Sequence, residues 1–178
     1  WCHVLIALCF LAALPYTRLL HAFAAPLQLL RATPLPRPAL STPFDLMQLI
    51  ESGNFDVKVG ANSVTDLASD LRLSFLACTD CGRCEEACPA HTSGAALSPR
   101  ELIQSLRGAV LEAGRGKAPA DLLGGGVNEA QVWACRLCGA CSEACPVLIH
   151  PPAPILELRR GLVAQGRLDR KQSAFLSN

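Results

Sequence analysis

Most of the cysteines in this chain fall into two copies of one pattern, Cys-x2-Cys-x2-Cys-x3-Cys-Pro, at residues 78–89 and 135–146. This run binds paired [4Fe–4S] clusters. Its three closely spaced thiolates wrap one face of a cube, and the fourth points away from it. The proline that follows fixes its own φ, so the chain leaves the cluster in a set direction. The spacing therefore predicts iron–sulfur chemistry, which is electron transfer.

The fourth cysteine of each run serves the other cluster in the two-cluster arrangement. We therefore assign one cluster to Cys78, Cys81, Cys84 and Cys145, and the other to Cys135, Cys138, Cys141 and Cys88. The repeat extends beyond the ligands, because residues between them also recur at a constant offset of 135 − 78 = 57 positions. A duplication is the simplest account of this likeness.

Paired zinc sites and a disulfide framework are the other interpretations of these cysteines. Zinc takes four ligands from two Cys-x2-Cys pairs and has no use for a third cysteine three residues on. A disulfide scaffold would not be flanked by a membrane-type apolar segment. We therefore favour iron–sulfur clusters, and a structural metal site beside a membrane anchor is the non-redox alternative.

An apolar segment opens the chain, in which 51% of all residues are hydrophobic. No acidic residue occurs before Asp45. A spanning helix needs about 20 mainly apolar residues, and residues 1–14 and 19–30 supply them with Pro15 as a kink. A signal peptide would need an initiator Met, a basic start and a cleavage site, which are not evident. We expect residues 1–31 to be the last transmembrane helix of a membrane domain whose other helices lie upstream.

The distribution of charge predicts on which side of the membrane the rest of the chain lies. Arg18, Arg31 and Arg37 lie at and beyond the end of the apolar segment, and basic flanks favour the cytoplasmic side of a membrane. We therefore expect a protein of the cell inner membrane with its cluster domain in the cytoplasm. The net charge of +1 argues against a nucleic-acid partner, because binding phosphates needs a concentrated basic surface.

The remaining chain divides into three parts. Residues 32–64 form a proline-rich connector and arm, with a short helix at residues 44–52 and a short strand or extended segment at residues 55–60. Residues 65–166 form the cluster domain, and residues 167–178 a tail or the start of a further region. Few strand signals occur, so the fold class is mainly α: the end of a transmembrane helical domain, then an α-helical ferredoxin domain with two [4Fe–4S] clusters.

Helix signals locate four helices in the cluster domain. Ser98 and Glu101 form a capping box with proline between them, and helical spacing continues to residue 114. Asn128 can cap a helix that runs into the second cysteine run. Further helices are expected at residues 66–77 and 154–165.

Two histidines in the apolar segment could hold a cofactor. His3 and His21 are 21 − 3 = 18 residues apart, which is five helical turns, so one continuous helix would carry both on one face about 27 Å apart. Histidine is expensive in a bilayer and usually faces a partner in the protein interior. That partner could be haem iron, or both side chains could be hydrogen-bonded and inert at the two interfaces.

The run Leu14-Pro15-Tyr16-Thr17-Arg18-Leu19-Leu20-His21 and the residues up to Pro26 resemble the end of the last helix of the respiratory nitrate reductase gamma-subunit family. That family holds two b haems, and its last helix gives each haem one axial histidine, 18 residues apart. The resemblance implies that His3 and His21 are axial ligands of haem b, with partner histidines on an upstream helix.

Residues 65–165 resemble the cluster domain found in the C subunit of heterodisulfide reductase and in its relatives. The resemblance rests on residues 76–90, 97–101, 132–147 and 156–160. A gamma-type membrane domain joined to such a domain resembles membrane iron–sulfur reductases, including electron-transfer-flavoprotein:menaquinone oxidoreductases. Many of these continue into a cysteine-rich domain with paired CCG motifs, and none occurs in these residues.

The first functional hypothesis is an electron conduit. In it, two [4Fe–4S] clusters exchange single electrons with a soluble partner such as a flavoprotein or dehydrogenase, and with haem b and a quinone such as menaquinone in the membrane. The second is the electron-feeding portion of a heterodisulfide reductase-like thiol/disulfide reductase with a CCG-domain partner. No catalytic triad or carboxylate pair points to group transfer. Arg83 and Arg136 within the runs could raise cluster potentials by their charge, or be solvated surface residues.

Overall fold

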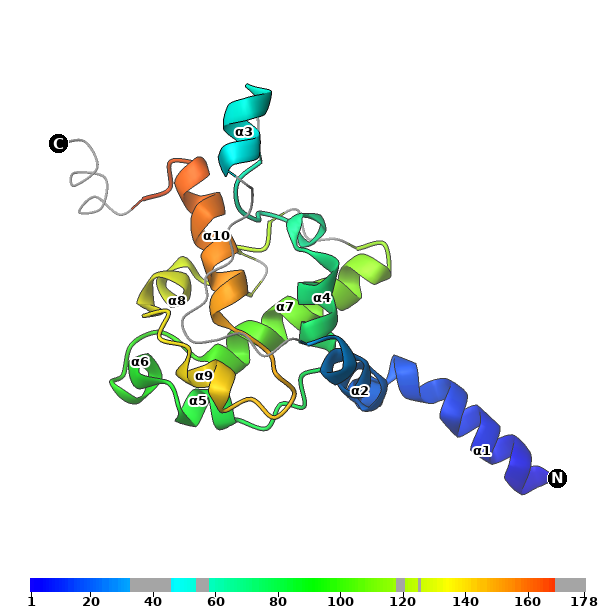
Figure 1. Cartoon of the computed structure of the whole chain (residues 1–178). Coiled ribbons are helices and arrows are strands. Elements are labelled where there is room, and N and C mark those ends of the chain that lie inside the picture. The colour runs from blue at the N-terminus through cyan, green and yellow to red at the C-terminus, as the bar shows by residue number, and fades with distance from the viewer. Residues whose placement is uncertain (33–45, 54–57, 118–120, 125, 169–178) are drawn as a thin grey trace.

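The computed structural model describes residues 1–32, 46–53, 58–117, 121–124 and 126–168 (Figure 1). These residues are mainly helical, as predicted. Among them, Leu123 and Val127 form an isolated β-bridge. Residues 33–45 and 54–57 of the predicted connector and arm, which include the first half of the segment expected at residues 55–60, lie outside the described residues, as does most of the tail. The described part of that segment, residues 58–60, is not a strand. The short helix expected at residues 44–52 is present as α3 (Leu46–Ser52).

The cluster domain combines long helices with single-turn ones. The long helices are α4 (Ser69–Leu76), α7 (Pro99–Gly114) and α10 (Pro152–Ala164). The shorter ones are η3 (Val64–Asp66), α5 (Arg83–Glu86), α6 (Pro89–Thr92), α8 (Glu129–Ala134) and α9 (Ala140–Glu143). Phe75 of α4, Leu106 of α7 and Leu158 of α10 are fully buried members of one hydrophobic core. The core therefore joins segments from both sides of each cysteine run.

Capping residues fix the starts of two of these helices; the predicted cap at Asn128 is confirmed, and of the capping box predicted for Ser98 and Glu101 the bond to Ser98 is present. Ser98 Oγ accepts a hydrogen bond from Glu101 N at 3.1 Å, and Pro99 occupies the first turn of α7. Asn128 Oδ1 accepts from Ala130 N at 3.0 Å at the start of α8. Each bond satisfies a backbone donor that the first turn of a helix leaves unpaired. The helix expected at residues 66–77 is shorter, because η3 ends at Asp66 and α4 begins at Ser69.

A close backbone approach attaches the segment before η3 to α10. Ala61 N donates to Glu157 O at 3.0 Å. Gly60 has φ +82°, and a Cβ built on it would lie 2.1 Å from Gly161 N. A glycine is required at this position because a side chain would meet backbone that cannot move aside.

The single kinked helix predicted for residues 1–31 is broken in the structure. Helix α1 (Cys2–Ala13) is followed by two 3-10 turns, η1 (Leu14–Tyr16) and η2 (Arg18–Leu20), and then by α2 (His21–Arg31). Pro15 has no N–H to donate, and Thr17 is extended with φ −108° and starts a new helical segment by accepting from Leu19 N at 3.2 Å. Within the described ranges, no helix combines the length and apolar character needed to cross a membrane.

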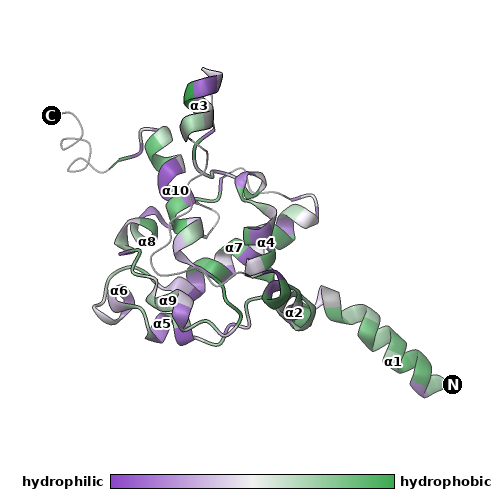
Figure 2. Cartoon of the chain, in the orientation of Figure 1, coloured by the Kyte–Doolittle hydropathy of each residue, from purple (hydrophilic) through white to green (hydrophobic). Residues whose placement is uncertain are grey.

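The two N-terminal helices differ in their surroundings. Helix α2 packs against α4 and buries Ala24 and Gln28. Helix α1 buries no residue and projects away from the domain, apolar along most of its length (Figure 2). A helix that is hydrophobic all round is normally buried against other apolar material. The described residues provide none for α1, whereas α2 is part of the packed domain.

Candidate iron–sulfur site

The two cysteine runs adopt the same backbone turn. Asp80 and Leu137, at equivalent places in the runs, have φ of 58° and 54°, and both are followed two residues later by a left-handed glycine, Gly82 or Gly139. Two left-handed positions so close together coil the chain tightly before α5 and α9 begin. The coil brings the first three cysteines of each run to one side. A side chain at positive φ is strained, most of all for leucine, and neither position was predicted.

The four cysteines assigned to the first cluster line one cavity. Cys78, Cys81 and Cys84 come from the first run and Cys145 from the second, around a space of about 390 Å³ that is partly open to solvent. Pro151 and Ile103 add to the wall. This cavity thus brings together the four cysteines of one proposed ligand set.

The other four cysteines line a second cavity, of about 350 Å³. Cys135, Cys138 and Cys141 come from the second run, and Cys88 crosses over from the first. Pro151 also lines this cavity, so the two spaces lie on either side of one proline. Cys81 and Cys138 are the exposed ligand candidates, and they occupy equivalent places in the two runs.

The chemistry of the thiols fits a cluster with a cationic core. All ten cysteines are free of disulfides. Burial raises the pKa of Cys84 to about 11 and that of Cys141 to about 12, and the neighbouring thiols add to both shifts. Thiols so placed ionise together only when positive metal centres compensate their charges. In the described part of the chain, no three His, Cys, Asp or Glu side chains group closely enough to hold a metal ion; the thiols are instead spread around each cavity.

Polar groups of α7 and of the residues that follow the second cysteine run donate hydrogen bonds to ligand candidates of the first cavity. Gln104 Nε2 donates to Cys78 Sγ at 3.2 Å, and Ile149 N donates to Cys145 Sγ at 3.3 Å. Arg107, one helical turn beyond Ile103, donates from Nη1 to the carbonyl oxygen of Cys78 at 3.1 Å. The two donors to sulfur favour negative charge there, since hydrogen bonds to the ligand atoms stabilise it.

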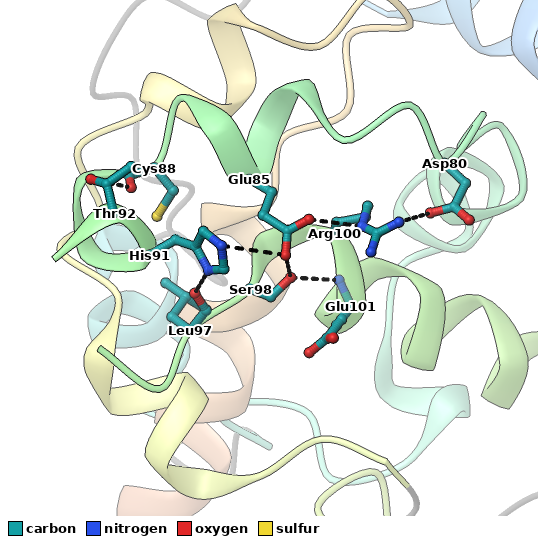
Figure 3. Close-up of polar contacts among 9 residues, drawn as sticks. All are labelled: Asp80, Glu85, Cys88, His91, Thr92, Leu97, Ser98, Arg100 and Glu101. Atoms are coloured by element: carbon teal, nitrogen blue, oxygen red, sulfur yellow. Dashed lines mark hydrogen bonds and ion pairs between the residues drawn. The ribbon is translucent and has the colours of Figure 1, made fainter. Parts of the chain in front are cut away.

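An ion-paired group ties the first run to the start of α7 (Figure 3). Glu85 accepts from Ser98 Oγ at 2.8 Å and from Arg100 Nε at 2.8 Å. Arg100 Nη1 also lies 3.5 Å from Asp80 Oδ1. The hydrogen bond from Ser98, together with the charge of Arg100, lowers the pKa of Glu85. Arg100 lines the first cavity, and two carboxylates balance its charge.

An arginine of α10 contacts the second cysteine run. Arg159 of α10 donates from Nε to Val132 O at 3.0 Å and from Nη2 to Cys135 O at 2.5 Å. Its guanidinium lies 5.3 Å from the ring centre of Trp133, and its Nη2 is 3.3 Å from the Trp133 carbonyl oxygen. These carbonyls belong to the end of α8, where backbone acceptors have no helical partner. Leu137 N donates to Cys135 Sγ at 3.4 Å.

The histidines after the two runs contact the polypeptide. His91 Nδ1 lies 3.0 Å from Leu97 O, and its Nε2 lies 3.6 Å from Glu85 Oε1. His150 Nδ1 lies 2.6 Å from the Oγ of Ser142, and Ser142 is the residue of the second run that is equivalent to Glu85. Burial lowers the pKa of His150. Neither histidine lines either cavity.

The predicted haem ligands are not on one helix. His3 is exposed on α1, and His21 is partly exposed at the first residue of α2. The break at residues 14–20 removes the common face that a continuous helix would give them. Cys2 and Cys9 are both exposed on α1.

Comparison with known proteins identifies the domain that carries the cysteines. Residues 77–149 match the family described as the 4Fe-4S dicluster domain. The EtfAB:quinone oxidoreductase of Syntrophomonas wolfei is 31% identical over 190 residues, covering 92% of this chain and 26% of that protein. A probable membrane-anchored ferredoxin of Chromohalobacter salexigens is 27% identical, covering 74% of this chain and 23% of the relative.

A third relative bears on the resemblance found in the sequence. The C subunit of the ferredoxin/F(420)H(2)-dependent CoB-CoM heterodisulfide reductase of Methanosarcina acetivorans is 34% identical over 96 residues, covering 53% of this chain and 50% of that relative. The resemblance to heterodisulfide reductase is thereby confirmed for the cluster domain. The chain spans about a quarter of the length of the first two relatives and half of the third. No solved structure gives a significant match.

Proposed function

Because residues 77–149 are a 4Fe–4S dicluster domain, whose chemistry is electron transfer, we propose that this chain is the electron-transfer part of a membrane-bound oxidoreductase. It would pass single electrons between a soluble redox partner and quinone. One observation carries the proposal: each of two adjoining cavities is lined by three cysteines of one run and the fourth of the other. The proposed ligand sets are Cys78, Cys81, Cys84 and Cys145, and Cys135, Cys138, Cys141 and Cys88.

When bound, [4Fe–4S] clusters supply one-electron oxidation and reduction over a wide range of potentials. The chain's own residues hold the two sites against each other, since Pro151 lines both cavities. The buried Cys88 and Cys141 keep one side of the second site dry, whereas the exposed Cys81 and Cys138 bring one edge of each site to the surface. Those edges are where a redox partner could approach.

The membrane and quinone parts of the proposal have separate support. Two relatives are named as an EtfAB:quinone oxidoreductase and a probable membrane-anchored ferredoxin. Helix α1 is apolar on most sides and buries none of its residues, as expected of a segment that packs among lipids or other membrane helices. We propose that α1 belongs to a membrane domain of the cell inner membrane, that the cluster domain faces the cytoplasm, and that a flavoprotein is the soluble partner.

Haem b ligation by His3 and His21 is a separable part of the proposal. Its support is the resemblance of residues 14–26 to the gamma-subunit family, and any second axial ligand would come from outside this chain. An α-band of b-type haem in the membrane-extracted protein, lost in His21→Ala, would support it. A cluster-loaded protein without that band would remove haem from the proposal and leave the cluster assignment intact.

A heterodisulfide reductase-like function is the second candidate. The observation in its favour is the match of the cluster domain to the C subunit of such a reductase over half of that relative's length. In this case the same two sites would supply electrons to a CCG-domain partner that reduces a disulfide. Electron transfer to quinone analogues, compared with a disulfide substrate in the presence of the natural partners, distinguishes the two.

The test of the shared proposal is a metal count on the full chain, purified without oxygen. We expect about eight iron atoms and eight acid-labile sulfides per chain, as two [4Fe–4S] clusters require, and cubane EPR signals on reduction. Zinc without sulfide would overturn the redox proposal and favour the structural-metal alternative.

A further inference from the structure

Two arginines from different helices contact the two cysteine runs at the same place. Arg107 of α7 donates to the carbonyl oxygen of Cys78 at 3.1 Å, and Arg159 of α10 donates to that of Cys135 at 2.5 Å. Cys78 and Cys135 are the first cysteines of their runs. Each arginine thus bonds to the backbone of one proposed ligand.

The duplication does not account for this likeness. At the offset of 57 residues, the position equivalent to Arg107 is 107 + 57 = 164, which is an alanine, and the position equivalent to Arg159 is 159 − 57 = 102, a leucine. The two helices therefore supply the same group to the same backbone atom from unrelated sequence positions.

Helix capping explains only part of the coincidence. Each first cysteine follows the end of a helix, α4 or α8, where carbonyl oxygens lack a helical partner and need a donor. A neutral donor or water would satisfy those oxygens equally well. The presence of a permanent positive charge at both places therefore calls for a further explanation.

The charges of these arginines act in a partly desolvated place. Both side chains are half-buried, and the guanidinium group stays protonated in proteins. Among the described residues, Arg159 forms hydrogen bonds to neutral carbonyls and has no carboxylate partner. Arg100, by comparison, has its charge balanced by Glu85 and Asp80. A positive charge such as that of Arg159, which has no carboxylate partner among the described residues and is only partly hydrated, acts more strongly on its surroundings.

We propose that Arg107 and Arg159 set the reduction potentials of the two cluster sites, one arginine for each site. The proposal depends on the proposed cluster ligands. Adding one electron to a site makes it more negative by one charge, so a fixed positive charge beside the first ligand favours the reduced form. Each arginine therefore raises the potential of its own site. Arg107 acts on the site of Cys78, and Arg159 on the site of Cys135.

The test is an EPR-monitored redox titration of the full, cluster-loaded chain carrying Arg107→Gln or Arg159→Gln. Cys81→Ala and Cys138→Ala, each removing a ligand from one proposed set, assign the two signals. We expect each Gln variant to shift the reduction equilibrium of its own site about tenfold toward the oxidised form, which is about 59 mV for one electron. The other site should stay unchanged, so each variant is the control for the other.

Lysine variants separate charge from fold. Arg107→Lys and Arg159→Lys keep the positive charge but lose the planar fork, so the potentials should stay near wild type although the thermal midpoint falls. Arg160→Gln, which removes a neighbouring guanidinium paired with Glu157, should leave both potentials unchanged.

Three results would overturn the proposal. One is a Gln variant that retains both clusters at unchanged potentials, and another is a Gln variant that shifts both sites equally. The third is a Lys variant in which the reduction equilibrium of its own site shifts by the full tenfold toward the oxidised form, because only the hydrogen-bond geometry would then matter. This result is decisive even if a Gln variant fails to assemble its clusters. A wild-type chain without sulfide would instead refute the cluster assignment itself.

Discussion

Asp80 and Leu137 share one left-handed backbone conformation, with φ of 58° and 54°, at equivalent points of the two cysteine runs. The shared turn shows that the run dictates its own backbone, whatever side chain occupies that point. Aspartate tolerates this region better than leucine does. The strain is maintained because the flanking cysteines and glycine must face one cavity.

Replacing Asp80 tests that strain. Asp80→Val should destabilise the chain by about 1–2 kcal/mol more than Asp80→Asn, because a β-branched residue resists positive φ and asparagine accepts it. Both variants lose the ion pair with Arg100, so the comparison isolates the backbone. Thermal midpoints of the cluster-loaded chain, measured without oxygen, provide the check. Equal midpoints would mean that the turn relaxes.

Cys81 provides a direct test of ligation. Cys81→Ala should lower the iron content of the purified chain by about half and remove one cubane signal, because a site loses one of its four thiolates. Cys9→Ser is the matched control, since Cys9 is exposed on α1 and distant in sequence from both runs. Unchanged iron in the Cys81 variant, or equal loss in the Cys9 variant, would contradict the ligand assignment.

Ser98 joins helix capping to the ion-paired group at the first site. Ser98→Ala should cost about 1–2 kcal/mol, because it removes the cap of α7 and also the donor to Glu85. Ser98→Thr keeps the hydroxyl and should recover most of that loss. Chemical denaturation followed by circular dichroism measures both variants. A threonine variant as unstable as the alanine variant would show that side-chain shape, rather than the hydrogen bonds, governs this position.

His150 should make stability depend on pH. Burial lowers its pKa in the folded chain, so the unfolded chain binds a proton more readily below about pH 6.5. Its contribution is therefore complete above that pH and is lost as the pH falls through the lower, folded-state pKa. Thermal midpoints between about pH 8 and about pH 5.5 should fall less steeply for His150→Asn than for wild type. Parallel curves would rule out this histidine as a source.

Gly60 should be among the least replaceable residues of the domain. Gly60→Ala is expected to cost about 3 kcal/mol, because its Cβ would meet the backbone of α10. Gly53→Ala is a matched control, since Gly53 also has positive φ, +63°, but nothing within 4 Å of the added carbon. It should cost about 1 kcal/mol. Urea midpoints compare the two, and similar losses would mean that α10 can shift to make room.

Local rules made part of the molecule predictable from its sequence. The mainly helical class and the caps at Ser98 and Asn128 follow from helical spacing and capping, which depend on near neighbours in the chain. The ligand spacing predicted which four cysteines would share a site, and each cavity is lined by one such set. The break at residues 14–20 was not predicted. There, hydrophobicity alone favoured continuation, whereas Thr17 offered the backbone a competing hydrogen bond.

The contacts between distant segments were also beyond sequence reasoning. Arg83 and Arg136 drew attention because they lie within the runs, and Arg136 does line the second cavity. The arginines bonded to the first cysteines come from α7 and α10 instead, far along the chain from the runs that they contact. Their positions follow from how the helices pack, which a one-dimensional pattern does not contain.

The exchange of the fourth cysteine between the two cavities has a consequence for how the chain is built. With ligands shared in this way, each inorganic core would act as a cross-link that closes a loop containing the whole of α7 and α8. Closing such a loop removes chain entropy from the unfolded ensemble, and neither core can be completed by its own run alone. Insertion of either core would therefore already join the two runs, and a chain that holds neither core would be open to proteolysis between residues 89 and 134.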